Sequence, residues 1–311
     1  MNKGLVYKTT GSWYAVRDAN GRMWKARIKG KLKIDDEISS TNPIAVGDLV
    51  SFQEEDETAN TAIISDVLQR ENYIVRVSPH NKHQKHIVAS NLDLAILVAT
   101  LAEPRTSQGF VDRFLLTAEM YHIPAVLVLN KTDRLSESAK ETARHWTEMY
   151  EAAGYKVFHT AALQKDTVAP IQELLQGRTG LFSGHSGVGK STLINALLPN
   201  QNLRTGAVSG WSGKGQHTTT FAEMFDGPDA SRIIDTPGVK EFGLINIERD
   251  ELGHYFPEIK REMEGCRFNN CMHLDEPGCA VKDAVAAEKL DEARYVSYCN
   301  ILEDLGNHRR R

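Results

Sequence analysis

One stretch of eight residues limits the possible folds of this chain more than any other feature. Residues Gly184–Ser191 read Gly-His-Ser-Gly-Val-Gly-Lys-Ser and match the pattern G-x-x-x-x-G-K-[ST]. A β-type run, Gly180–Ser183, precedes the stretch, and an apolar helical run, Thr192–Leu198, follows it. A strand, a glycine-rich loop and a helix in this order are typical of the P-loop, whose glycines let successive backbone N–H groups turn toward a phosphate. The chain is therefore predicted to contain an α/β nucleotide-binding domain.

The chemistry of phosphate binding gives the loop residues separate roles. We expect Lys190 to act in catalysis by bridging oxygens of the β- and γ-phosphates, and the Ser191 hydroxyl to bind Mg²⁺. The N-terminus of the following helix adds the positive end of the helix dipole. The expected nucleotide contacts in this region are Gly184, His185, Ser186, Gly187, Val188, Gly189, Lys190, Ser191 and Thr192.

The wider sequence divides into three regions, predicted as domains 1–80, 81–245 and 246–311. In the middle region, buried-type strands alternate with helical stretches, which predicts a parallel sheet with crossover helices. The expected strands are Leu94–Thr100, Ala125–Leu129, Lys156–His159, Gly180–Ser183 and Arg232–Ile234.

The first region has shorter β-type runs separated by polar turns, of which Asp18–Gly21 is the clearest hairpin. The expected strands are Gly4–Tyr7, Trp13–Arg17, Met23–Ile28, Asp48–Phe52 and Ala62–Val67. Five short strands fit a small β-barrel such as the OB-fold, and an SH3-like barrel fits almost as well. Residues 1–33 also hold nine Lys and Arg against one acid. These basic residues would either bind a phosphate-rich partner or form an ordinary solvated surface, and both interpretations stay open. Trp13, Tyr14 and Trp24 would either stack on nucleic-acid bases or fill the barrel core.

A second motif indicates which base the nucleotide carries. Asn130, Lys131, Thr132 and Asp133 follow an expected strand, at the sheet edge where open α/β sheets bind ligands. They resemble the N-K-x-D guanine-specificity element of GTPases. Asp133 would accept hydrogen bonds from guanine N1–H and the exocyclic amine. Adenine offers neither donor there and would leave the carboxylate unpaired, at a cost of about 2–5 kcal/mol.

Two further segments extend the nucleotide site. Asp235–Gly238 follows an apolar strand and resembles the D-x-x-G element, in which Asp235 would hold Mg²⁺ and the Gly238 N–H would sense the γ-phosphate. Thr160 and Ala161 resemble the second guanine-contacting loop, with threonine where serine is common. The guanine motif therefore precedes the P-loop, the reverse of the usual order. A circular permutation accounts for this order, because the termini of a domain often lie close together.

The last region is charged, ends in a helical pattern and contains a cluster of possible metal ligands. Its members are Cys266, Cys271, His273 and Cys279. Three thiolates and one imidazole form a closed tetrahedral set suited to structural Zn²⁺. Met1–Thr10 lacks the apolar segment of a secretory signal, so we expect a cytoplasmic protein, in which cysteines bind metals more often than they form disulfides. Cys299 is expected to be a core thiol, unless the fold brings it near enough to replace His273.

With these motifs in this order, the chain resembles the circularly permuted ribosome-assembly GTPases of the RsgA/YjeQ/YloQ family. The resemblance rests on Asn130–Asp133, Gly184–Ser191, Gln216–Thr220, Asp235–Gly238 and the cysteine cluster, and it covers essentially the full length. It implies an OB-fold barrel, a permuted GTPase domain and a zinc-binding helical domain, in an enzyme that hydrolyses GTP to GDP and phosphate. It also implies contact with 16S rRNA, stimulation by the 30S subunit, and action in late maturation or checking of that subunit. We expect a monomer without a membrane partner, and other assembly factors stay open as partners.

The loop Thr205–Thr220 contains four glycines and is expected to be switch I, ordered by nucleotide or by a partner. By analogy with related GTPases, Thr219 completes the Mg²⁺ shell, with the neighbouring threonines as alternatives. Val239 stands where other GTPases have a water-orienting glutamine, and valine cannot hydrogen-bond to water. We therefore expect slow intrinsic hydrolysis, with His217 as the catalytic group that positions water, or alternatively as a solvated loop histidine.

Two other functions stay open at this point. A GTP-gated RNA-binding module with incidental hydrolysis is compatible with Val239. A P-loop ATPase or kinase is compatible with Gly184–Ser191 alone, but the guanine-specific carboxylate of Asp133 argues against it.

Overall fold

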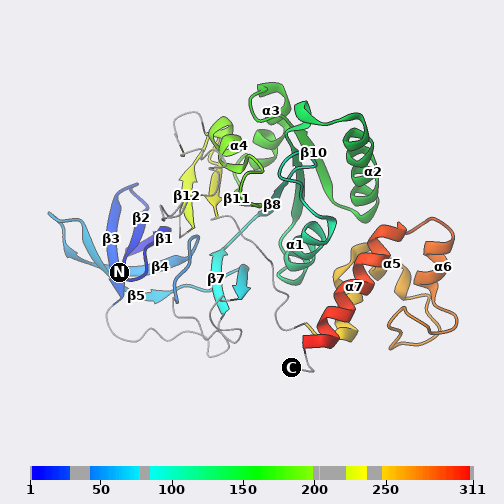
Figure 1. The fold of residues 1–311 in the computed structure, drawn as a ribbon. Coiled ribbons are helices and arrows are strands. Elements are labelled where there is room, and N and C mark those ends of the chain that lie inside the picture. The colour runs from blue at the N-terminus through cyan, green and yellow to red at the C-terminus, as the bar shows by residue number, and fades with distance from the viewer. Residues whose placement is uncertain are drawn as a thin grey trace, which may run out of the picture.

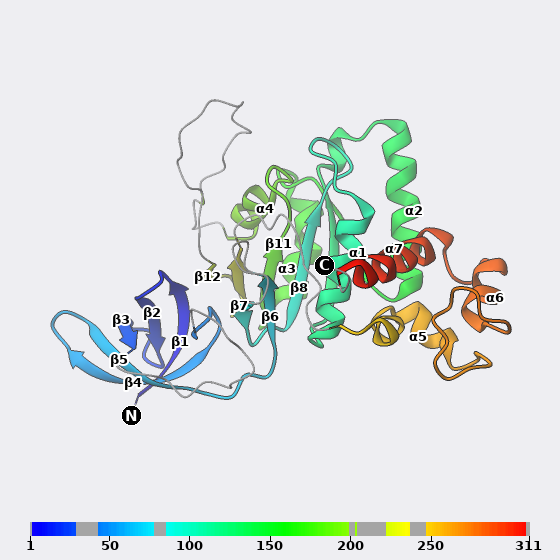
Figure 2. The ribbon, with the colours of Figure 1, turned by 60° about the horizontal axis from the view of Figure 1, so that its bottom comes forward.

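The computed structural model describes residues 2–28, 43–77, 85–198, 203, 222–236 and 247–308. The chain forms an N-terminal barrel, a central α/β domain and a C-terminal helical module, and the barrel and the helical module lie on opposite sides of the central domain (Figures 1 and 2). The strands are β1 Asn2–Thr9, β2 Tyr14–Asp18, β3 Met23–Ile28, β4 Leu49–Asp56, β5 Thr61–Val67, β6 Tyr73–Val77, β7 Lys85–Ser90, β8 Leu94–Ala99, β9 Ala125–Asn130, β10 Lys156–Thr160, β11 Thr179–Ser183, β12 Glu223–Asp226 and β13 Arg232–Asp235. The α-helices are α1 Gln108–Met120, α2 Glu137–Ala153, α3 Lys165–Leu175, α4 Lys190–Leu197, α5 Pro257–Met263, α6 Ala280–Ala286 and α7 Glu292–His308, and the 3₁₀ segments are η1 Thr132–Arg134 and η2 Arg249–Tyr255.

The five predicted strands of the first region close into a barrel. They pair in the order β1-β2-β3-β5-β4, and β4 also pairs with β1, which closes the ring. All pairs are antiparallel except β3 with β5, and this arrangement confirms the OB-type barrel. Tyr14 and Trp24 lie in the core with 3% and 2% of their surface exposed, whereas Trp13 is half-buried at the surface. The structure therefore places two of the three aromatics in the core and leaves one at the surface.

The Asp18–Gly21 turn forms as predicted between β2 and β3. The Asp18 carboxylate accepts hydrogen bonds from the backbone N–H groups of Asn20 and Arg22, each at 2.9 Å, and Gly21 has a φ of 81°. An aspartate that holds its own turn, followed by a glycine in the left-handed region, is a stable hairpin connection.

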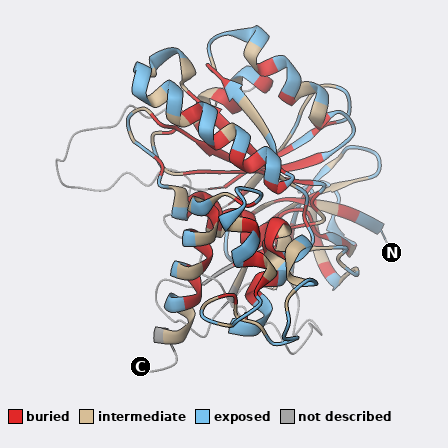
Figure 3. Cartoon of the chain, turned by 90° about the vertical axis from the view of Figure 1, so that its right-hand side faces the viewer, coloured by how far each residue is buried: buried red, intermediate tan, exposed pale blue. Residues whose placement is uncertain are grey.

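The central domain is a twisted sheet with helices on both faces. Its strands follow the order β10-β9-β8-β11-β13-β12, all parallel except β12. Alternate residues of the fully buried β8 face opposite sides: Ala95, Leu97 and Ala99 pack against α1 and α2, and Leu94, Ile96 and Val98 pack against α3 and α4. Figure 3 shows this as buried segments along the sheet and the inward sides of the helices. Each buried Leu, Ile or Val side chain in these layers contributes about 1.5–3 kcal/mol by leaving water.

Three short strands, β6, β7 and β12, were not predicted from the sequence. β6 and β7 pair with each other on either side of residue 80, where a domain boundary was expected, so the three domain bounds stay predictions. β12 is the outer strand of the central sheet and pairs with β1 of the barrel at Lys8 and Glu223. Through this pairing, barrel and central domain form one sheet of 11 strands.

The C-terminal module packs on α1 and α2 of the central domain. Its own core includes Leu252, Phe256, Ile259, Val281, Leu290, Tyr298, Ile301 and Leu302. The Arg294 side chain, 2% exposed, contacts Asp112 of α1 and donates to Glu258 Oε1 of α5 at 2.6 Å. Its guanidinium lies 4.7 Å from the Phe256 ring centroid and 5.4 Å from that of Tyr150. A buried charge is tolerated only with close partners, and these contacts join α7 to α1 and α2 of the central domain.

Candidate nucleotide-binding and metal sites

The P-loop lies between β11 and α4, as the sequence predicts, and two of its glycines are required by close contacts. At Gly189, φ is 90° and an added Cβ would lie 2.4 Å from Asn130 Nδ2. At Gly184, an added Cβ would lie 2.4 Å from the backbone oxygen of Val98 on β8. Any side chain at these positions would push the loop away from the neighbouring strand ends. The short distance at Gly189 also shows that Asn130 of the guanine motif packs against the P-loop.

Two hydrogen bonds join the guanine motif to the P-loop. Asn130, the last residue of β9, donates from Nδ2 to the backbone oxygen of Val188 at 2.9 Å, although the two residues are 58 positions apart. Lys131, in the left-handed region with φ of 61°, donates from Nζ to the backbone oxygens of Gly187 at 2.6 Å and of Glu103 at 2.8 Å. Asp133 follows with 40% of its side chain exposed. The motif predicted to hold the base and the loop predicted to hold the phosphates therefore belong to one site.

The second guanine loop is bonded to the first. The Thr160 hydroxyl donates to Asn130 Oδ1 at 2.9 Å, and the Thr132 hydroxyl donates to the Thr160 backbone oxygen at 3.1 Å. The Ala161 N–H donates to the hydroxyl of Thr167 at 3.0 Å. Thr167, in the first turn of α3, was not among the predicted site residues. The signal that could have identified it is a hydroxyl side chain six residues after Ala161.

Lys190 and Asp235 are brought together at the phosphate side of the site. The Lys190 ammonium contacts the Asp235 carboxylate and donates to the Thr236 backbone oxygen at 2.6 Å. Both residues are less than one-tenth exposed. The Thr236 hydroxyl donates to the Phe182 backbone oxygen at 2.9 Å, which ties the end of β13 to β11. The groups predicted for phosphate and for Mg²⁺ thus converge at the carboxyl ends of β11 and β13.

Some of the remaining predicted residues are described by the structure, and others lie outside the described ranges. Ser186 is exposed, and Ser191 and Thr192 are half-buried at the start of α4. The His185 ring stacks on Phe110 of α1 with centroids 3.7 Å apart. Burial lowers the pKa of His185, so it is neutral at physiological pH. His217, Thr219 and Gly238 lie outside the described residues.

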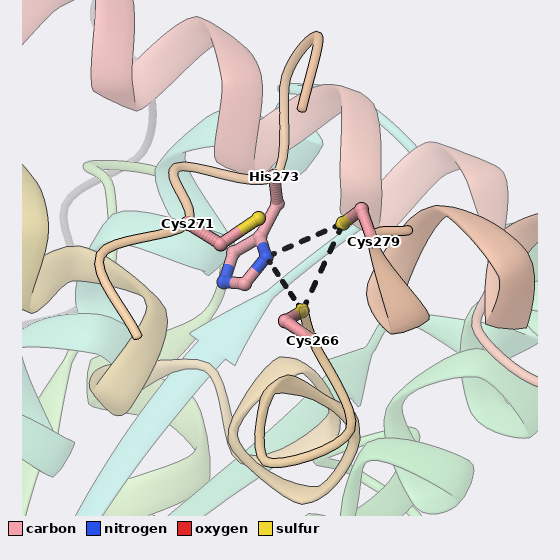
Figure 4. Close-up of side chains that lie close together, drawn as sticks. All are labelled: Cys266, Cys271, His273 and Cys279. Carbon is pink, nitrogen blue, oxygen red and sulfur yellow. Dashed lines mark hydrogen bonds between the residues drawn. The ribbon is translucent and has the colours of Figure 1, made fainter. Parts of the chain in front are cut away.

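The four predicted zinc ligands form one compact group (Figure 4). Their ligand atoms all lie within 4.8 Å of one another. His273 Nδ1 is 3.5 Å from Sγ of Cys266 and of Cys279, and these two sulfurs are 4.0 Å apart. Tetrahedral zinc, with metal–sulfur distances near 2.3 Å and metal–nitrogen distances near 2.0 Å, requires edges of about 3.5–3.8 Å. The two sulfur–nitrogen distances match these edges and the sulfur–sulfur distance is slightly longer, so the group could hold one tetrahedral metal ion; Cys299 is not part of it.

The chain around His273 is held by hydrogen bonds that do not involve the cluster. The Glu276 carboxylate accepts from the N–H groups of Met272 at 2.8 Å and Leu274 at 2.9 Å. The hydroxyl of Tyr295 on α7 donates to the His273 backbone oxygen at 2.6 Å. Burial lowers the pKa of His273, which favours the neutral imidazole that binds metals. A metal at this point would connect the cluster loop to Cys279 at the start of α6, and the Tyr295 hydrogen bond joins the same loop to α7.

A guanine motif and a P-loop bonded together on a parallel sheet, with the guanine motif first in the chain, define a circularly permuted P-loop GTPase. Family models support the same class: the one described as RsgA GTPase matches residues 67–245, and the one described as RsgA N-terminal domain matches residues 3–64. The chain belongs to the RsgA GTPase family and is a GTP-hydrolysing enzyme.

Relatives and solved structures agree with this assignment over the full length. The chain is 47% identical to "Small ribosomal subunit biogenesis GTPase RsgA" of Christiangramia forsetii, covering 97% of this chain and 96% of that protein. It is 48% identical to the protein of the same name from Bacteroides fragilis strain YCH46, with the same coverage. The crystal structure of YjeQ from Thermotoga maritima is similar with a TM-score of 0.78 and 31% identity over 98% of both chains. The structure of YloQ, a circularly permuted GTPase, has a TM-score of 0.74 and 28% identity over 99% of this chain and 96% of that one.

Proposed function

We propose that this enzyme acts on the small ribosomal subunit during late maturation, and that contact with the 30S particle stimulates its hydrolysis of GTP. The names of its relatives support a role in small-subunit biogenesis. The observation that carries the nucleotide part is the pair of bonds from Asn130 to Val188 and from Lys131 to Gly187, because a single nucleotide can then contact both motifs.

In this proposal, different residues contact the base and the phosphates of the nucleotide. Asp133 accepts from the guanine edge, and Ala161 contacts the base from its backbone. Gly187, Gly189 and Lys190 surround the phosphates. Ser191, Thr219 and Asp235 would hold the Mg²⁺ that accompanies GTP, and the ion would neutralise phosphate charge. Binding would separate the Lys190–Asp235 pair, since each partner then turns to the nucleotide or its metal.

The metal of the C-terminal module is proposed to be one structural Zn²⁺. It would be held by Cys266, Cys271, His273 and Cys279, with no position left open for water. The barrel would contact 16S rRNA, and the protein would work in the cytoplasm as a monomer. Among the described residues, no helix is both long and apolar enough to span a bilayer.

The stimulation is tested by steady-state GTP hydrolysis with and without purified 30S subunits. The protein alone is expected to turn over slowly, and subunits are expected to raise the rate at least about tenfold, because groups supplied in trans can complete a GTPase site. Lys190→Ala removes the phosphate cation and should stay at background under both conditions. Isolated 50S subunits are the matched control. Equal rates with 30S, 50S and no subunit would contradict the proposal.

His217 is proposed to position the attacking water in the stimulated enzyme. His217→Ala is expected to lower the rate with 30S by about 100-fold, the usual contribution of a positioned acid–base group, while nucleotide affinity changes little. His145→Ala, which removes an exposed histidine of α2, is the control. Stimulated rates that are the same in wild type and His217→Ala would exclude this role.

A further inference from the structure

The barrel carries a shallow hollow that the nucleotide and metal sites do not use. It has a volume of about 340 Å³ and lies beside the junction of β1 with β12. Its lining includes Trp13, Met23 and Asn60, and Lys8 and Lys25 stand at the same place. Met23 is 43% exposed, so the hollow presents apolar surface to solvent.

Cations surround the aromatic surface of this hollow. Lys25 Nζ lies 4.4 Å from the Trp13 ring centroid, and the guanidinium of Arg27, which also pairs with Glu55 beside the hollow, lies 5.9 Å from it. Lys25 forms no ion pair with any carboxylate in the described ranges. An aromatic ring with adjacent cations is the usual platform for single-stranded nucleic acid, in which a base stacks and a phosphate is neutralised. An acidic peptide would use the cations but leave the apolar surface of Trp13 and Met23 without a partner.

Lys8, the other lysine that lines the hollow, also holds the barrel to the central domain. Lys8 Nζ is 2.8 Å from Glu223 Oε2, in the β1–β12 pairing, with 41% and 28% of the two side chains exposed. Next to this pair, the Tyr7 hydroxyl donates to Asp226 Oδ1 at 2.7 Å, and Arg17 contacts the same carboxylate. β12 begins at Glu223, directly after the segment in which switch I is expected.

We propose that a single-stranded segment of RNA binds in this hollow, with a base on Trp13 and a phosphate that takes the place of Glu223 on Lys8. The inference rests on the proposed contact with rRNA and names where and how it occurs. Half-exposed ion pairs contribute little net stability, so a phosphate can displace the carboxylate. RNA binding would thereby loosen β12 from the barrel. Because coupling is reciprocal, a change at Glu223 must alter RNA affinity.

The test measures fluorescence anisotropy of a labelled single-stranded RNA of about eight nucleotides with the full-length protein, without ribosomes, across a salt series. Trp13→Ala should weaken binding about tenfold at an unchanged salt slope, since stacking is not ionic. Lys8→Gln should weaken binding about threefold and reduce the salt slope by about 0.7, the value for loss of one phosphate contact on a single strand. Glu223→Gln should tighten binding about threefold, because Lys8 is released.

A double variant and two controls make the outcome specific. In the Lys8→Gln background, Glu223→Gln should have no further effect if Glu223 acts through Lys8. Lys3→Gln and Leu49→Ala change exposed barrel residues outside the hollow and should shift affinity less than twofold. The proposal would be overturned if Glu223→Gln still tightened RNA binding in the Lys8→Gln background. It would also be overturned if Lys8→Gln changed RNA affinity no more than Lys3→Gln does.

Two further outcomes separate the possible causes of failure. If polyglutamate competes as well as RNA while Trp13→Ala is neutral, the ligand is an acidic peptide and the RNA assignment is wrong. If 30S stimulation of the wild type is normal but all hollow variants bind the oligonucleotide alike, only this inference fails. Absence of 30S stimulation together with the predicted oligonucleotide pattern would instead reject the proposed function and support this site.

Discussion

Replacing Asp133 by asparagine is expected to change the base that the enzyme accepts. The aspartate offers two acceptor oxygens to the two donors of guanine, N1–H and the exocyclic amine, whereas asparagine offers one oxygen and one NH₂ group. Xanthine carries an oxygen in place of that amine and can accept from the asparagine. We expect GTP affinity to fall about 100-fold and XTP affinity to rise about 100-fold, because unmet polar groups in a binding site discriminate strongly.

Competition of GTP, XTP and ATP against a labelled guanine nucleotide measures this change. Asp166→Asn, at an exposed acid in the first turn of α3, is the matched control and should leave the order GTP over XTP unchanged. Asp133 is 40% exposed and is not needed for the fold, so its replacement should not alter thermal unfolding. If Asp133→Asn still prefers GTP over XTP, Asp133 does not contact the base, and the guanine specificity proposed for this site would be lost with it.

Removal of the metal is expected to have the largest effect on stability. The protein should contain one zinc ion, and Cys279→Ser should lose it, because Cys279 is 3% exposed within the four-ligand group. Metal binding contributes on the order of 10 kcal/mol to the folding of small zinc modules. We therefore expect the C-terminal module to unfold in an early, separate transition, with loss of helical signal from α6 and α7.

Metal analysis with thermal unfolding, followed by far-ultraviolet circular dichroism, measures both effects. Cys299→Ser is the matched control, since Cys299 lies on α7 outside the ligand group and should keep the metal. A strong chelator should reproduce the effect of Cys279→Ser in the wild type. Unchanged zinc content in Cys279→Ser, or equal loss in Cys299→Ser, would contradict the assignment of the ligands.

The barrel strands, the P-loop and the clustering of three cysteines with one histidine were predictable because their signals are local. The alternation of β1 to β5, the asparagine–glycine turn before Met23, and the four ligands from Cys266 to Cys279 each lie within a short stretch of chain. Such features follow from backbone geometry and side-chain chemistry that neighbouring residues determine. β12 has only four residues, which is too short for its alternation of apolar and polar residues to predict a strand. Its single pairing position on β1 also leaves no signal in the local sequence.

By itself, the sequence determined the motifs of this protein: a phosphate loop, a guanine motif placed before it, and a set of three cysteines and one histidine able to hold a metal ion. Only the tertiary structure decided which distant groups meet. It bonded Asn130 to Val188, buried Arg294 between Asp112 and Glu258, and placed Lys8 against Glu223. These contacts join residues far apart in the chain, so they depend on how whole elements pack. A sequence motif indicates which interactions a side chain can form, and tertiary packing determines which residue it contacts.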